Sequence, residues 1–125
     1  MRSLALAAMF AAGISLASAA ELNPTGQWEV STGESRYRIT YCGDGHELCA
    51  KLTWLRDDAR TEKNMALLNR YVVRHAKPGE ANTWVGTMQY NGESYDATAR
   101  LVSTDAMELK SCSGMFCRSF LLRRL

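Results

Sequence analysis

A chain of 125 residues, 46% of them hydrophobic and 22% charged, is long enough for one domain with one core and too short for several. Its 15 basic and 13 acidic residues leave a formal net charge of +2, and the basic residues are spread along the sequence. This balance gives no basic stripe for nucleic acid or for an anionic membrane, so we expect neither as a partner.

Residues 1–20 have the features of a secretion signal. Arg2 gives a positive start, an uncharged run rich in alanine and leucine follows, and the small residues that end the segment suit a signal peptidase. The run is too short for a comfortable membrane span, so we expect cleavage after Ala19 or Ala20 and no stable membrane insertion of the product. The remaining residues 21–125 then form a single exported domain, expected in the periplasm, with the extracellular space as the alternative.

The rest of the sequence alternates apolar and polar residues in short runs separated by turns. After a lead-in of residues 21–25, the runs occupy residues 26–30, 36–42, 48–55, 71–75, 83–90, 94–101, 106–111 and 116–124. Runs with this period are typical of half-buried strands, and Asn91-Gly92 is a strong signal for a two-residue hairpin. About eight strands in sequential hairpins predict an all-β fold, an up-and-down antiparallel barrel.

Residues 56–68 interrupt this pattern. A charged loop containing Asp57 and Asp58 is followed by Thr61 and by apolar residues at helical spacing. We expect one helical turn here that caps a mouth of the barrel, with the two acidic residues on a solvated loop beside it.

The first and last strands carry residues that can close a barrel. Gly26-x-Trp28 lies on the first strand and Arg124 ends the last one. A tryptophan plugging one end with a cation over its ring is a stable closure, so we predict that Gly26, Trp28 and Arg124 form it.

Four cysteines in a short exported chain indicate a disulfide framework. Cys42 and Cys49 bracket one turn, and Cys112 and Cys117 bracket another. Their spacing favours pairing within each hairpin, so that each bond fixes the register of its hairpin.

Large aromatic residues and small residues share the expected inner face of the barrel. An eight-stranded barrel is just wide enough to be filled by side chains or to hold one small ligand, and both interpretations stay open. Arg118 is in phase with inward residues and would need an acidic partner or an anionic ligand there, although strand twist can also aim it at solvent. The candidate ligand contacts are Tyr37, Tyr41, Trp54, Met88, Tyr90, Arg118 and Phe120.

Metal and enzyme sites have weak support in the sequence. Cys42-x-Asp44-x-His46-x-x-Cys49 contains the residue types of a zinc site, but disulfides explain both cysteine pairs at once, so we expect no metal and no cofactor. Nucleophile and phosphate-loop motifs are lacking, and His46 and His75 are the only histidines. We therefore expect a protein that is not an enzyme.

A series of motifs runs through the expected domain in a fixed order. They are Gly26-x-Trp28, residues 48–55, the loop 58–70 with Asn64, Trp84-x-Gly86, Tyr90-x-Gly92-x-x-Tyr95, Cys112, Cys117-Arg118 and Arg124. In order and spacing they resemble a bacterial family, the domain-of-unknown-function family numbered twenty-one forty-seven. The family's usual glycine is Ala50 here, its proline-containing turn is Asn91-Gly92, and the proline after the loop asparagine is Met65.

This resemblance implies an exported, lipocalin-like (calycin-type) barrel suited to an apolar or amphipathic ligand, and it implies no reaction. Our leading hypothesis is a periplasmic protein that binds such a ligand inside the barrel, with the two disulfides at its rim. The alternative is an inhibitor of a protease or lysozyme that uses residues 21–25 or its loops, since small barrels with a Gly-x-Trp start also resemble bacterial metalloprotease inhibitors. A protein partner is therefore possible as well.

Overall fold

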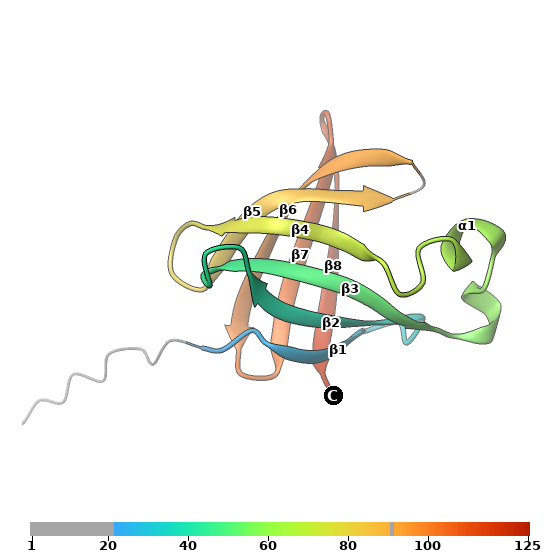
Figure 1. The fold of residues 1–125 in the computed structure, drawn as a ribbon, viewed down its shortest axis with the longest axis horizontal. Helices are drawn as coiled ribbons and strands as arrows, with labels where there is room; N and C mark the ends of the chain where they lie inside the picture. The colour runs from blue at the N-terminus through green and yellow to red at the C-terminus, as the bar shows by residue number, and fades with distance from the viewer. Residues whose placement is uncertain (1–21, 91) are drawn as a thin grey trace, which may run out of the picture.

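Eight strands follow one another along the chain and close into an antiparallel barrel in the computed structural model, which describes residues 22–90 and 92–125 (Figure 1). Each strand pairs with the next, and the last returns to pair with the first. The expected all-β, up-and-down barrel is confirmed. The expected signal segment 1–20 and Asn91 of the predicted hairpin lie outside the described residues. The strands are β1 Gly26–Val30, β2 Ser35–Cys42, β3 Glu47–Leu55, β4 Tyr71–Pro78, β5 Thr83–Tyr90, β6 Glu93–Ser103, β7 Ala106–Ser113 and β8 Phe116–Arg124.

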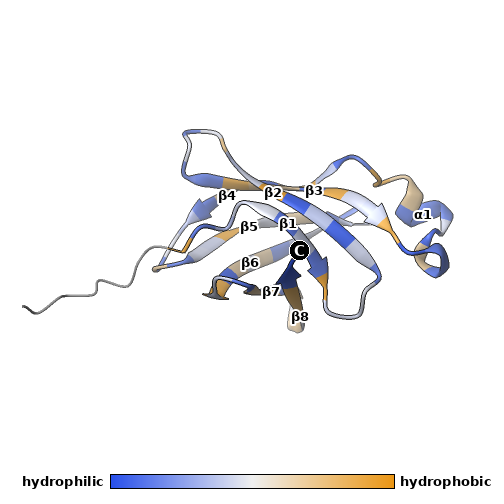
Figure 2. Cartoon of the chain, turned by 90° about the horizontal axis from the view of Figure 1, so that it is seen from below, coloured by the Kyte–Doolittle hydropathy of each residue, from blue (hydrophilic) through white to orange (hydrophobic). Residues whose placement is uncertain are grey.

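Alternation of polar and apolar residues places one face of each strand inside the barrel, as the banded hydropathy of the strands shows (Figure 2). In β3 a bulge breaks this alternation: Arg36 pairs with Trp54 but Tyr37 pairs with Leu52, so Thr53 is an extra residue. The inward placement predicted for Trp54 is therefore wrong. Its ring lies on the outer surface, 4.2 Å from the Arg36 guanidinium, while Leu52 and Leu55 are buried.

Both predicted disulfides form, but at opposite ends of the barrel. Cys112–Cys117 joins β7 to β8 at the end where the chain turns between those strands, whereas Cys42–Cys49 joins β2 to β3 at the other end. Only Cys112–Cys117 lies at the open rim, so the prediction that both disulfides fix that rim is wrong. Each bond still ties a hairpin whose strands are paired in register.

The end that carries Cys42–Cys49 is closed by Trp28, which is fully buried. Its indole Nε1 donates a hydrogen bond to the Pro24 carbonyl oxygen, and the Arg124 guanidinium lies 4.4 Å from the ring centroid. Arg124 also donates to the carbonyl oxygens of Thr25, Asn23 and Thr104. The predicted closure is thus present, and the lead-in is part of it.

Gly26 makes room for this closure. Its φ of +137° is rare for residues with a side chain, and a Cβ there would lie 2.9 Å from a guanidinium nitrogen of Arg124. Residues two positions apart on a strand share one face, so Gly26 and Trp28 both face Arg124. The Gly-x-Trp spacing follows, because the residue two positions before the tryptophan must leave room for the guanidinium over the ring.

The opposite end is covered in part by the segment between β3 and β4. It contains a 3-10 turn, η1 Asp57–Ala59, and a short helix, α1 Glu62–Met65, whose N-terminus is capped by the Thr61 side chain. The predicted helical turn is confirmed. No helix in the described part of the chain has the length and apolar character needed to cross a membrane.

Replacing Trp28 with alanine should lower the free energy of unfolding by about 3–5 kcal/mol, because it leaves a large cavity and removes the partner of Arg124. Urea denaturation followed by circular dichroism measures this. Trp54→Ala is the matched control on the outer surface and should cost on the order of 1 kcal/mol. Equal losses in the two variants would contradict the closure described here.

Candidate ligand pocket

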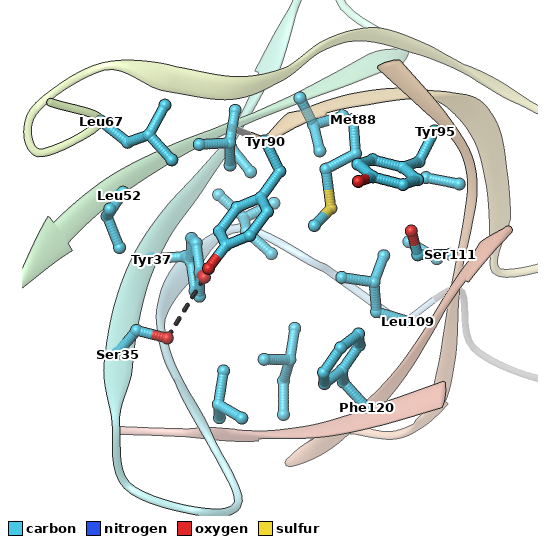
Figure 3. A pocket seen from close by; sticks show the side chains of 18 of the residues that line it. Ser35, Tyr37, Leu52, Leu67, Met88, Tyr90, Tyr95, Leu109, Ser111 and Phe120 are labelled. Atoms are coloured by element: carbon cyan, nitrogen blue, oxygen red, sulfur yellow. Dashed lines mark hydrogen bonds between the residues drawn. The ribbon is translucent and has the colours of Figure 1, made fainter. Parts of the chain in front are cut away.

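A cavity of about 810 Å³ occupies the barrel interior and opens at the end that α1 partly covers (Figure 3). All eight strands contribute to its wall, and Ala59, Asn64 and Leu67 of the capping segment border its mouth. This volume lies within the range of small-molecule sites, about 300–1,000 Å³. Of the two interpretations left open by the sequence, a filled interior and a pocket, the structure has the pocket.

The floor of the cavity is apolar and buried. Trp84 anchors it, because its indole Nε1 donates a hydrogen bond of 3.0 Å to the His46 carbonyl oxygen in the hairpin between β2 and β3. Two inward positions on β6 are small, and this leaves space above the floor. Floor residues that line the cavity and are buried are Ile39, Leu48, Trp84, Met107 and Leu122; the small wall residues are Ala97 and Ala99.

Polar groups gather around the mouth. The Tyr90 hydroxyl donates to the Asn64 side-chain oxygen at 3.0 Å, and Asn64 in turn donates to the Ala59 carbonyl oxygen at 2.8 Å. This chain ties the capping segment to β5 across the opening. On the other side of the mouth, the Tyr95 hydroxyl donates to a Glu93 carboxylate oxygen at 2.7 Å, and this bond raises the pKa of Tyr95.

Tyr37 reaches into the cavity from β2 (Figure 3). Its hydroxyl oxygen accepts a hydrogen bond of 3.2 Å from Ser35, which is itself buried. Burial raises the pKa of Tyr37 above its ordinary value of 10.0, and this outweighs the opposing effect of the Ser35 bond. Because Ser35 donates in this bond, the Tyr37 hydroxyl keeps its own hydrogen to donate toward the cavity.

Five of the seven predicted ligand contacts line the cavity: Tyr37, Met88, Tyr90, Arg118 and Phe120. Arg118 does so at the mouth while remaining exposed to solvent, so the inward and the solvent-facing alternatives each describe part of its position.

The other two predicted contacts, Tyr41 and Trp54, are not among the lining residues. The bulge on β3 turns Trp54 outward. Tyr41 is 43% exposed because pairing between β1 and β2 ends at Ile39, and Tyr41 extends past the closed end of the barrel.

Sequence reasoning missed several mouth residues. Tyr95 is in phase with Ala97 and Ser35 with Tyr37, so the period of their strands contained the signal. Asn64 was noted only as part of the loop 58–70 in the family resemblance, and periodicity gave no sign of its contact with Tyr90, which joins residues 26 positions apart.

Of the cysteines and histidines in the described residues, only Cys49 borders the cavity, and it is held in a disulfide. Cys42 and Cys49 are joined, and a disulfide supplies no thiolate for zinc. His75 is close to this bond, but its Nδ1 lies 2.9 Å from the Glu47 carboxylate, which also contacts Lys77. Neither His75 nor His46 lines the cavity.

The barrel matches a family model described as uncharacterized proteins conserved in bacteria, DUF2147, over residues 26–124. The chain belongs to this family. The match begins at the glycine and ends at the arginine of the closed end, so the DUF2147 domain is the complete barrel. Searches of curated proteins and of solved structures found no match.

In this DUF2147 protein, the buried Tyr37 should make stability fall in alkaline solution. Its folded pKa is raised, so the unfolded chain releases the proton more readily and folding stability is lost as pH rises through and above about 10. The free energy of unfolding, measured by urea denaturation between about pH 8 and pH 11, should fall less steeply in Tyr37→Phe than in the wild type. Parallel curves for the two proteins would show that Tyr37 is not ionised more easily on unfolding.

Proposed function

We propose that this DUF2147 protein is an exported carrier or sensor that binds a small apolar or amphipathic ligand inside its barrel and does not transform it. The observation that carries this proposal is the open cavity of about 810 Å³ with an apolar floor and a polar mouth. Such a gradient suits a molecule with an apolar body and a polar end. Burial of the body supplies most of the affinity, about 0.8 kcal/mol per methylene group.

The polar groups of the mouth support binding rather than catalysis. Tyr90 is hydrogen-bonded to Asn64, and Tyr95 is hydrogen-bonded to Glu93. Asn64 is in turn bonded to the Ala59 carbonyl oxygen, and polar groups held in this way suit orientation of a ligand. Among the described lining residues, no histidine stands beside a serine or cysteine nucleophile. We therefore retain the proposal that the protein is not an enzyme and needs no cofactor.

The periplasm remains the proposed location. Its support is the signal-like sequence of residues 1–20 together with two disulfides that bridge hairpins at both ends of the barrel.

The inhibitor alternative receives less support. Residues 23–25 accept hydrogen bonds from Arg124 and Trp28, and the Leu22 amide donates to Asn82. A lead-in held in this way contributes to the closed end, so an inhibitory arm made of it would first have to leave Trp28 partly uncovered.

A tryptophan in place of Ser111 should block the pocket. Ser111 points into the cavity from β7, and a large ring there would occupy ligand space (Figure 3). Binding of an environment-sensitive apolar dye, followed by fluorescence titration, should weaken at least about tenfold, since a displaced apolar group of modest size costs 1.4 kcal/mol or more. Ser119→Trp, on the exposed face of β8, is the control and should bind as the wild type does. Equal affinities in all three proteins would place the dye outside the barrel.

Arg118→Met tests the charge of the ligand's polar end. A long-chain carboxylate should lose at least about fivefold in affinity, because an electrostatic contact at a partly solvated mouth contributes on the order of 1 kcal/mol, whereas the alcohol of the same length should bind nearly unchanged. Arg123→Met, on the outer face of the same strand, is the matched control. A uniform loss for both ligands would indicate that Arg118 only shapes the wall.

A further inference from the structure

The hairpin between β7 and β8 carries the most exposed large apolar side chains described by the structure. Met115 is 96% exposed and Phe116 is 85% exposed, whereas the other exposed large apolar residues lie between 37% and 59%. Single exposed apolar residues are common, but two adjacent ones at a loop tip, almost without protein contact, are informative. The tip projects beyond the neighbouring hairpins (Figure 1).

Local structure holds these two side chains out in solvent. Ser113 pairs with Phe116 across a two-residue turn, and Gly114 occupies the first turn position with a φ of +62°. Glycine at that position is typical of tight hairpin turns. The Cys112–Cys117 disulfide closes the hairpin directly behind the turn. The tip therefore cannot fold back easily to bury its apolar atoms against the barrel.

The tip belongs to the mouth of the pocket. Phe116 borders the cavity as well as projecting into solvent, and Arg118, two residues later, lines the same edge. Whatever surface receives the tip therefore faces the opening. Within the described part of the chain, Arg118 has no carboxylate within 4.0 Å.

We propose that Met115 and Phe116 insert into the headgroup region of a phospholipid bilayer and seat the open mouth of the barrel on it. Arg118 lies where an aliphatic stem can follow the inserted residues while its cation meets lipid phosphate. The use of this membrane contact rests on the proposed function: with the mouth on the bilayer, an apolar ligand would pass between membrane and pocket without crossing water. Its physical basis, the exposed tip, is independent of any ligand.

Area and charge favour a bilayer over a protein as the occupant. Two side chains offer far less than the roughly 800 Å² per partner that a stable protein interface or a dimer needs. A bilayer requires no matching shape, only apolar groups that reach its acyl boundary. Without Arg2 of the expected signal, 14 basic and 13 acidic residues leave a formal net charge of +1, so long-range attraction to anionic lipid is weak and the contact should be reversible and should form on zwitterionic lipid.

The test is partition of the oxidised protein onto phosphatidylcholine vesicles, measured by co-sedimentation over a lipid titration. The wild type should partition, and Met115→Ser/Phe116→Ser should reduce the partition coefficient at least about tenfold. The control Val85→Ser/Val102→Ser removes two exposed apolar side chains from the strand walls and should have little effect. Absence of wild-type partition, or an equal loss in the control, would overturn the proposal and would leave a protein as the occupant.

A second test measures directly whether the tip enters the bilayer. The tryptophan of Phe116→Trp should be quenched by brominated phosphatidylcholine, and that of Val102→Trp should not; no extra quenching at position 116 would also overturn the proposal. Dye binding is measured in parallel without vesicles for Met115→Ser, which should keep wild-type affinity because Met115 is not among the residues that line the cavity. Dye binding without vesicle contact would refute the membrane proposal alone, and vesicle contact without dye binding would refute the proposed ligand function alone.

Discussion

The contact between Arg124 and Trp28 is the constraint on which the barrel depends. It joins the last strand to the first, and the same guanidinium reaches three carbonyl oxygens in two other segments. One side chain thus connects the lead-in, β1, β8 and the turn before β7. Because the tryptophan is fully buried beneath it, closure and core formation at this end are a single event rather than two independent ones.

Concentrating the closure at one end leaves the other end free to be a pocket. The floor is dense because Trp84 and Met107 belong to one buried apolar cluster beneath the cavity. Toward the mouth, the polar groups of Asn64, Tyr90 and Tyr95 join the wall, and a short helix held by a few hydrogen bonds covers part of the opening. Interiors are usually close-packed, so this asymmetry within one small core is the feature that requires a functional reason.

The fold was predictable from the sequence because its signals are local. Period-two runs, turn residues and the Gly-x-Trp motif each specify a feature within a few positions, and the barrel is their sum. The error at Trp54 arose because Thr53 looks like any outward residue; a bulge shows only when two strands are aligned. Tyr41 was misplaced because the point at which β2 outruns β1 depends on register, and the Asn64–Tyr90 bond depends on a distant loop. Whether the barrel interior is a pocket or a filled core depends on the summed volumes of the inward side chains, which the alternation of polar and apolar residues does not reveal.

The two ends of the barrel also differ in how they can move. At the closed end, opening would expose Trp28 and break bonds from several segments at once, which makes a cooperative and costly transition. At the mouth, release of the Tyr90–Asn64 bond would let the capping segment lift while the floor stays intact. A ligand of the proposed kind would therefore enter at the mouth, between this segment and the disulfide-tied hairpin. Such a route passes beside Phe116, so the proposed entrance and the exposed apolar tip lie at the same edge of the barrel.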